Sequence, residues 1–315
     1  MKRFYKNMTY IIIFFMVLII FTVTYNIYTA PVAKHKVFGV SYMTMNNPFY
    51  KIINNEILKV VEKNNDTLIT LDPELDVDKQ NEQIYKFIDQ KVDGIFINPI
   101  DFEQIEPALQ AAKRANIPVI IIDAPVSDES LVNCTIVSDN YDAGVQCAKD
   151  MMERLDSANI VLLKHTTAKS AKERIEGFLS VIDNNEKYKV INEAECDGQL
   201  EIAMPKMQEI IEETPDIDVV MALNDPSALG ALAALEKNNK NDVYGIDGTP
   251  EIKALIGRNQ MIVGTVEQSP IKMGQIAVEN MYNILNGKKI EKNIIIPISL
   301  INKENLFKYD EDRWQ

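Results

Sequence analysis

The stretch VVMALNDPSALGALAALE, residues 219–236, indicates how this chain folds. Its first part, Val219–Ala222, is an apolar run of strand length, and Ser227–Glu236 has the composition of a helix. Between them Asp225 precedes Pro226. An aspartate can cap the first helical turn, and proline suits the first helical position because its missing N–H would have no partner there. A strand, a capped turn and a helix therefore form one unit.

The same unit recurs along the chain from Lys36 onward. Further strands are predicted at Val37–Tyr42, Thr67–Leu71, Gly94–Ile97, Val119–Ile122, Ile160–Leu163, Lys189–Ala194, Val243–Ile246 and Ile262–Val266. Further helices are predicted at Phe49–Lys63, Lys79–Gln90, Phe102–Arg114, Ala143–Arg154, Ala171–Asp183, Glu201–Glu212, Pro250–Ile256 and Ile271–Leu285. Apolar strands separated by helices are typical of parallel sheets covered on both faces. We therefore predict an α/β fold with two doubly wound parallel-sheet lobes.

Polar side chains follow the predicted strands at the turns into the helices. Capping residues also precede proline at Asn47, Thr249 and Ser269, and Asp101 with Gln104 forms a capping box. Good helix capping alone would explain these residues. Their position adds a second meaning, because ligands of open α/β sheets bind beyond the carboxyl ends of the strands. The side chains at those ends are Asn47, Phe49, Asn98, Asp123, Asn224, Asp247 and Gln268. Amides and carboxylates exchange hydrogen bonds with hydroxyls, and an aromatic face covers C–H groups, so the set suits a neutral polyol.

Charge and cysteine content exclude several classes of protein. The formal net charge of −13 argues against nucleic-acid binding, which needs a surplus of Lys and Arg on one face. Cys134, Cys147 and Cys196 are an odd number without paired spacing, so they predict neither a disulfide framework nor a zinc site. They are expected to be small buried residues.

The N-terminal segment, residues 1–35, predicts a location. Lys2, Arg3 and Lys6 precede an apolar run over residues 10–28, close to the ~20 residues that cross a hydrocarbon core as a helix. The basic side then faces the cytoplasm, and the rest of the chain lies outside it. A cleavable signal peptide shares these features. A good small-residue cleavage site is missing after the run, which favours an uncleaved transmembrane anchor and a cell-membrane, single-pass protein with an extracytoplasmic domain.

Catalytic motifs are missing from the sequence. It has neither the G-x-S-x-G nucleophile elbow nor a phosphate-binding loop ending in Gly-Lys-Ser/Thr. The histidines His35 and His165 have no Cys, Ser or metal-ligand neighbour in sequence. Acid–base pairs of carboxylates stay open, so an enzyme acting on a carbohydrate is kept as a remote alternative. We expect no enzyme, no cofactor and no metal.

An ordered set of motifs resembles the ribose-type periplasmic binding proteins. The motifs are Asn46-Asn47-Pro48-Phe49-Tyr50, Ile97-Asn98-Pro99, Ile117-Pro118-Val119 with Asp123, Ser138-Asp139-Asn140, Ala171-Lys172-Glu173-Arg174 with Gly177-Phe178, Asn224-Asp225-Pro226-Ser227-Ala228-Leu229-Gly230, Gly245-Ile246-Asp247-Gly248-Thr249-Pro250 and Gln268. The resemblance covers residues 37–301. Any one tripeptide is weak, but the ordered set is specific.

The resemblance implies two lobes joined by three crossings, with a monosaccharide in the cleft between them. It predicts an N-terminal lobe of residues 36–138 and 268–298 and a C-terminal lobe of residues 139–267 and 299–315. It implies that Phe49 stacks on the sugar. It also implies that hydroxyls are bound by Asn47, Asp123, Arg174, Asn224, Asp247 and Gln268. Arg174 is included as a site residue because of this resemblance. Its planar guanidinium can bind two oxygens at once, which suits the role.

The chain also departs from the ribose-type pattern. Ala124 stands where the family has an arginine after the cleft aspartate, and Cys196 stands where a second stacking aromatic is expected. Met43 replaces a small polar residue at the base of the cleft. We keep Met43, Tyr50 and Cys196 as further candidate site residues. The departures argue against ribose itself and favour another pentose, similar to xylose.

Two roles fit such a receptor. The segment over residues 10–28 makes the chain resemble the membrane-anchored, xylose-sensing members of the family, which report sugar to a membrane sensor histidine kinase as part of a two-component system. The alternative is the substrate-binding component of a sugar ABC transporter, with an ABC permease as its partner. We predict the sensory role, and the predicted anchor is what separates the two.

Overall fold

The computed structural model describes residues 2–29, 35–214, 216–235 and 241–314, and the chain divides into two compact units. The first unit is Met1–His35, and its described residues include the helix α1 (Lys2–Thr29). Across the described ranges, no helix combines the length and the apolar character needed to cross a membrane. The helix predicted over residues 10–28 is present, but the predicted transmembrane span is not found.

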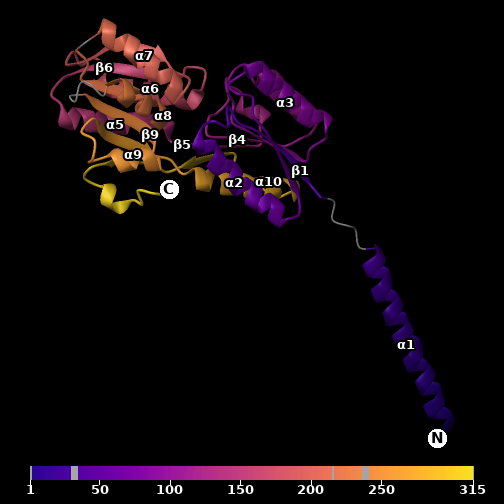
Figure 1. Cartoon of the computed structure of the whole chain (residues 1–315). Coiled ribbons are helices and arrows are strands. Elements are labelled where there is room, and N and C mark those ends of the chain that lie inside the picture. Colours follow the sequence, from indigo (N-terminus) through magenta and orange to yellow (C-terminus); the bar gives the residue numbers. More distant parts are fainter. Residues whose placement is uncertain (1, 30–34, 215, 236–240, 315) are drawn as a thin grey trace. The chain divides into compact units, whose positions relative to one another are not determined.

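The second unit, Lys36–Gln315, contains two six-stranded sheets (Figure 1). The first sheet has the order β11-β5-β4-β3-β1-β2, and its neighbouring strands are all parallel. Its strands are β1 (Val37–Ser41), β2 (Thr67–Leu71), β3 (Gly94–Ile97), β4 (Val119–Ile122), β5 (Cys134–Ser138) and β11 (Asn293–Ile296). The helices packed on this sheet or on each other are α2 (Pro48–Lys63), α3 (Val77–Asp89), α4 (Glu106–Arg114) and α10 (Pro270–Leu285). We call this part the first lobe.

The second sheet repeats the same architecture. Its order is β12-β10-β9-β8-β6-β7, with β12 alone antiparallel to its neighbour among the described strands. Its strands are β6 (Ala158–Lys164), β7 (Tyr188–Glu195), β8 (Val219–Ala222), β9 (Asp242–Asp247), β10 (Ile262–Glu267) and β12 (Ser299–Asn302). Its helices are α5 (Asn140–Arg154), α6 (Lys169–Ile182), α7 (Leu200–Glu213), α8 (Asp225–Leu235) and α9 (Pro250–Leu255). We call this part, with the short 3-10 helix Leu306–Lys308, the second lobe.

The central strands are buried on both faces, as the apolar runs predict. Every residue of β3, β4 and β8 is buried, whereas the edge strands β2 and β7 are partly exposed. This pattern confirms two α/β lobes with mainly parallel sheets. The chain passes from one sheet to the other after β5, after β10 and after β11. The predicted residue limits of the lobes stay a prediction.

The capped turns start the helices much as predicted. The Asn47 side chain accepts a hydrogen bond from the Phe49 N–H at 2.9 Å, and Thr249 and Ser269 cap α9 and α10. At α8 the capping differs, because Asn224 Oδ1 accepts from the Ser227 N–H. The predicted cap residue, Asp225, instead accepts from the Thr249 N–H and the Thr265 hydroxyl, which ties two turns of the second lobe together.

Some elements differ from the prediction. The helix predicted from Phe102 begins at Glu106, because Pro107 has no N–H to continue an earlier turn, and Asp101 caps a separate turn instead. The strands β5, β11 and β12 were not predicted. β11 and β12 are short edge strands, and each pairs with a strand far away in sequence, so no local pattern predicts them. β5 lies inside its sheet between β11 and β4, and its apolar run, residues 136–137, is too short to indicate a strand.

Candidate functional site

A polar cavity lies where the carboxyl ends of the two sheets face each other. It contains ≈ 390 Å³ of space between protein atoms, part of it open to solvent. Its lining includes most of the predicted site residues: Asn47, Phe49, Asp123, Arg174, Asn224, Asp247 and Gln268, together with Met43 and Tyr50.

The first lobe contributes Asp123, which follows β4 directly. Its backbone has a φ of 71°, in the left-handed region that only a few non-glycine residues adopt. Its Oδ2 atom accepts hydrogen bonds from the Tyr50 hydroxyl and from Asn98 Nδ2, both at 3.3 Å. These two neutral donors hold one carboxylate oxygen and leave the other, Oδ1, without a hydrogen-bond partner among the described residues.

The second lobe contributes Asp247, at the end of β9. Its φ of 148° is again positive, so both cleft aspartates sit on strained backbone, as is common at functional sites. Gln268 Nε2 donates to Asp247 Oδ1 at 2.8 Å. In the described part of the chain, neither Asp247 Oδ2 nor Gln268 Oε1 has a hydrogen-bond partner.

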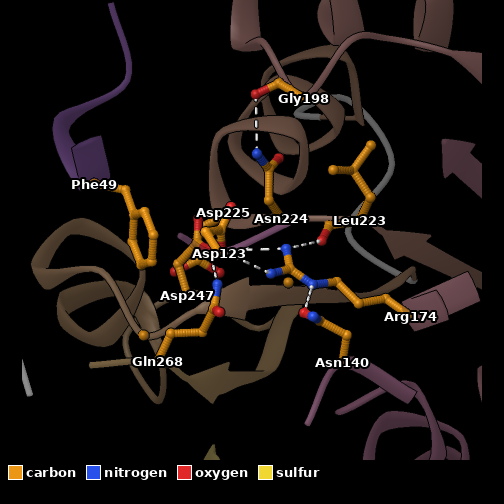
Figure 2. A network of polar contacts seen from close by, with 12 residues as sticks. Phe49, Asp123, Asn140, Arg174, Gly198, Leu223, Asn224, Asp225, Asp247 and Gln268 are labelled. Atoms are coloured by element: carbon orange, nitrogen blue, oxygen red, sulfur yellow. Dashed lines mark hydrogen bonds and ion pairs between the residues drawn. The ribbon is translucent and has the colours of Figure 1, made fainter. Parts of the chain in front are cut away.

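Arg174 reaches toward both aspartates from α6 (Figure 2). Its Nη2 lies 3.7 Å from Asp123 Oδ1, and its Nη1 lies 4.0 Å from Asp247 Oδ1. These separations are ion-pair distances but too long for hydrogen bonds. The guanidinium is instead held by Asn140 Oδ1, which accepts from Nε at 2.9 Å, and by the Leu223 carbonyl, which accepts from Nη1 at 3.0 Å. The arginine is thus fixed in place with one nitrogen, Nη2, still available.

Two glycines allow α6 to approach α5 closely enough for this placement. A Cβ at Gly144 would lie 1.8 Å from the Arg174 carbonyl oxygen, and one at Gly177 would lie 1.9 Å from the Tyr141 carbonyl oxygen. No side chain fits at such separations. The close helix pair therefore sets where Arg174 starts and brings Asn140, at the beginning of α5, against its guanidinium.

Burial controls the electrostatics of the cleft. It raises the pKa of Asp123, against the opposing effect of the nearby Arg174 charge. It raises the pKa of Asp247 well above the usual value, and the neighbouring carboxylate of Asp225 raises it further. It also raises the pKa of Asp225 itself to about 6. Three carboxyl groups near one guanidinium leave no local excess of positive charge, which disfavours an anionic ligand.

An aromatic row closes one side of the cavity. Tyr42 stacks on Tyr50 with ring centroids 5.6 Å apart, and Tyr50 meets Phe49 edge to face at 5.6 Å. Phe49 in turn contacts Trp314, whose ring centroid lies 5.7 Å away. Phe49 lines the cavity and is 2% exposed, so its ring is packed in place beside the carboxylates.

Two predicted residues do not line the cavity. Asn98 is fully buried, donates to Asp123 and to the Ile122 carbonyl, and accepts from the Met43 N–H, so it positions the aspartate from behind. Cys196 is also fully buried and its thiol contacts Ser227 and the Lys164 carbonyl. Cys196 therefore does not replace the second stacking aromatic that the ribose-type pattern has at this position. Burial raises the pKa of this thiol to about 11, which disfavours a reactive thiolate.

Other cavity residues were not predicted. His165 and Gln199 belong to the lining, while Asn140 and Trp314 hold lining residues from outside it. The sequence did contain an indication of Asn140, because it follows the helix cap Asp139 within the motif Ser138-Asp139-Asn140. Metal-binding groups of three or more His, Cys, Asp or Glu side chains are absent from the described residues.

Comparison with known proteins shows the family to which the chain is similar. Residues 38–289 match the model of the periplasmic binding protein domain. The ribose import binding protein RbsB of Bacillus subtilis (strain 168) is 32% identical over 270 residues, which cover 85% of this chain and 87% of that protein. RbsB of Escherichia coli (strain K12) is 29% identical over 83% of this chain and 88% of its own length.

A solved structure supports the same fold. An ABC transporter solute binding protein from Bacillus halodurans C-125, determined with bound myo-inositol, superposes with a TM-score of 0.82. It is 24% identical, and the match covers 89% of this chain and 98% of that protein. At this identity the likeness shows the fold alone. The curated relatives are named as binding proteins, which confirms the prediction that the chain is not an enzyme.

Proposed function

We propose that this chain, which belongs to the periplasmic binding protein domain family, is an extracytoplasmic receptor that closes on one neutral monosaccharide. The two lobes contribute different halves of the site, so a sugar contacts both only when they approach each other. Ligand binding then favours the closed arrangement by the difference in affinity between the two arrangements.

One observation carries this proposal: buried polar atoms around the cavity have no hydrogen-bond partner among the described residues. They are Asp123 Oδ1, Arg174 Nη2, Asp247 Oδ2 and Gln268 Oε1. Buried polar groups are nearly always paired, so unpaired ones around a cavity point to a ligand that completes them. Three acceptors and one donor match a polyol, whose hydroxyls donate to carboxylates and accept from a guanidinium. The ring of Phe49 offers an apolar face for the C–H groups of the same sugar.

The pentose class is supported by the relatives and by the departures from their pattern. Two relatives are named for ribose import, which favours a small sugar. Ala124 and Cys196 are both fully buried, and neither supplies the charged fork or the second ring that the ribose-type pattern has at these places. A pentose other than ribose, similar to xylose, accordingly fits a site with one ring wall and one arginine.

Thermal unfolding of the full chain in the presence of single sugars tests this proposal. The panel consists of D-ribose, D-xylose, L-arabinose and myo-inositol, with D-ribose 5-phosphate as a charged control. A neutral sugar at 100 times its dissociation constant raises the free energy of unfolding by about 2.7 kcal/mol. We expect a rise with a neutral pentose and none with the phosphate. A rise with the phosphate alone would contradict the proposal.

For the biological role, we propose first the substrate-binding component of a sugar ABC transporter, because the relatives are named as import binding proteins. The partner is then an ABC permease. A second role, sugar sensing through a membrane sensor histidine kinase, is favoured by the N-terminal sequence. Lys2, Arg3 and Lys6 precede the apolar run over residues 10–28, and no good cleavage site follows it. Retention of this segment would place the receptor at the cell membrane.

A deletion strain separates the two roles. The sugar-uptake genes are expressed constitutively in a strain that lacks this protein, and uptake of the identified sugar is measured. Loss of uptake supports the transporter component. Normal uptake, together with loss of sugar-induced expression in the otherwise wild-type background, supports the sensor. Mass spectrometry of the mature N-terminus then decides whether residues 1–30 are retained.

A further inference from the structure

The C-terminal segment of the chain touches the first lobe at the residue proposed to stack on the sugar. Trp314 lies with its ring centroid 5.7 Å from that of Phe49, at an interplanar angle of 64°. Phe49 is in the first turn of α2 in the first lobe, whereas residues 303–314 follow β12 in the second lobe. In Figure 1 the yellow C-terminal segment runs from the second lobe and ends beside α2. We call residues 303–314 the C-terminal strap.

A buried lysine ties the strap to the second lobe. Lys253 is fully buried, and its Nζ donates to the Asp310 carbonyl at 2.6 Å and also to the Arg313 carbonyl. A buried ammonium group needs such acceptors, because an unpaired one is very costly. Arg258 adds an ion pair to Glu311 at 2.9 Å on the surface. The strap is therefore anchored on both sides of its last turn before it reaches Trp314.

The anchor lies on the helix that follows a cleft residue in sequence. Lys253 belongs to α9, and α9 begins directly after the turn that presents Asp247 to the cavity. The other end of the strap contacts Phe49, which also lines the cavity. A continuous path therefore leads from the Asp247 turn through Lys253 and the strap to Phe49. It bridges the two lobes without using the sugar.

We propose that Trp314 is a positioning residue that holds the Phe49 ring and latches the two lobes in the closed arrangement. The proposal rests on the proposed function, since it assigns Trp314 a part in holding the sugar. When the lobes separate, Phe49 moves away from Trp314 and their contact is lost. The contact therefore slows opening, and with it the release of the sugar. Association begins from the open arrangement and does not use this contact.

The first experiment needs no sugar. Trp314 is the single tryptophan of the chain, so the intrinsic tryptophan emission reports this contact alone. Acrylamide quenching is measured on the ligand-free full chain. We expect Lys253→Met to increase the quenching constant about twofold, because the aromatic contact of Trp314 with Phe49 no longer has its anchor. Phe49→Leu should also increase quenching, without touching the strap. An unchanged quenching constant in both variants would overturn the latch.

The second experiment measures sugar release. D-Xylose and D-ribose are each used as the probe, and dissociation is followed after rapid dilution. Trp314→Ala should release the bound sugar about two- to tenfold faster with the association rate unchanged, which corresponds to the usual strength of an aromatic pair. Trp314→Phe should release it at nearly the wild-type rate. Phe307→Ala is the matched control, since this aromatic of the same strap is 82% exposed.

The outcomes separate this inference from the function on which it rests. Equal release rates in wild type and Trp314→Ala, with both sugars bound normally, would overturn the latch and leave the proposed function intact. Binding of neither sugar by the wild-type chain contradicts the pentose assignment. The quenching experiment still decides in that case whether the strap holds Trp314 against Phe49.

Discussion

The two lobes present the same residue types at matching places but surround them differently. Asn98 and Asp123 follow β3 and β4, whereas Asn224 follows β8 and Asp247 ends β9, and these strands occupy equivalent positions in the two sheets. In the first lobe the aspartate is held by neutral donors and lies beside aromatic rings. In the second lobe it lies near another carboxylate, Asp225, and accepts a hydrogen bond from Gln268. Arg174 comes from the second lobe and lies near both aspartates. The two lobes thus share one topology, but the first lobe forms an aromatic wall of the cavity and the second lobe contributes most of its charged groups.

This division explains why neither lobe alone makes a binding site. The first lobe offers the Phe49 ring and one carboxylate, but its own polar groups around Asp123 are largely paired with each other. The second lobe offers Arg174 and Asp247, but among the described cavity residues it supplies no Phe, Tyr or Trp ring. A sugar has both an apolar face and hydroxyls, so one sugar can contact the aromatic ring of the first lobe and the polar groups of the second lobe at the same time.

Removal of Arg174 should produce the largest effect, because it removes the group that lies between both aspartates. Arg174→Met leaves two buried carboxylates without their cation, and losses of about 2–5 kcal/mol in sugar affinity are usual for such a truncation. Titration calorimetry measures it. Arg154→Met is a matched control, since its ion pair to Asp242 is on the surface of the same lobe. Equal affinities for the two variants would remove Arg174 from the site.

The two aspartates should then differ from each other. Asp247→Asn and Asp123→Asn each remove a carboxylate acceptor, and each should lower sugar affinity by about 1–3 kcal/mol. Their effects on the ligand-free protein should differ in size. Burial and the neighbouring Asp225 raise the pKa of Asp247 well above its usual value, so Asp247→Asn should raise the melting temperature. Burial also raises the pKa of Asp123, but the nearby Arg174 charge opposes it, so Asp123→Asn should raise the melting temperature less. An equal or larger rise for Asp123→Asn would break the comparison between the lobes.

Helix packing provides a third comparison. A Cβ at Gly144, between α5 and α6, would lie 1.8 Å from a backbone oxygen, and a Cβ at Gly274, between α10 and α2, would lie 2.7 Å from the Ile53 carbonyl oxygen. Overpacking of this kind costs about 1–3 kcal/mol. Denaturant unfolding should show a larger loss for Gly144→Ala than for Gly274→Ala. Only Gly144→Ala should also weaken sugar binding through Arg174, so an equal loss of affinity in both variants would contradict the account.

The smallest effect concerns pH. The pKa of Asp225 is raised by burial to about 6, above its value in the unfolded chain. The folded state therefore binds this proton more tightly, and the cost of the buried charge at pH 7 is removed as the pH falls through about 6. From pH 7 to pH 5 this group should add about 1 kcal/mol to the free energy of unfolding. Asp225→Asn should abolish that part of the pH dependence, and an unchanged dependence in this variant would reject the assignment.

Much of the fold was predictable from the sequence because it depends on local signals. The apolar runs of β3, β4 and β8 and the capped turns at Asn47, Thr249 and Ser269 act within a few residues. The membrane span predicted from the same kind of pattern was not found in the part of the chain that the structure describes. The short edge strands β11 and β12 depend on pairing with distant partners, so their local sequence did not predict them.

The candidate site was predictable where the position of a residue at the end of a strand determines that its side chain faces the cavity. Asp123, Asp247 and Gln268 came together as expected. Asn98 also follows the end of a strand, but its side chain forms hydrogen bonds with Met43, Ile122 and Asp123 behind the cavity. Whether such an amide faces the ligand or its neighbour depends on packing. Trp314 was missed because it reaches Phe49 only through the course of the C-terminal strap.

The central claim is that the two lobes jointly bind one neutral sugar. Titration calorimetry of the full chain tests it most directly, with D-xylose, D-ribose and D-ribose 5-phosphate as separate titrants on wild type and on Phe49→Ala. The account predicts one-to-one binding of a neutral pentose by the wild-type chain, weaker binding by Phe49→Ala, and no binding of the phosphate. Equal affinity in Phe49→Ala and wild type, or binding of the phosphate alone, would contradict it.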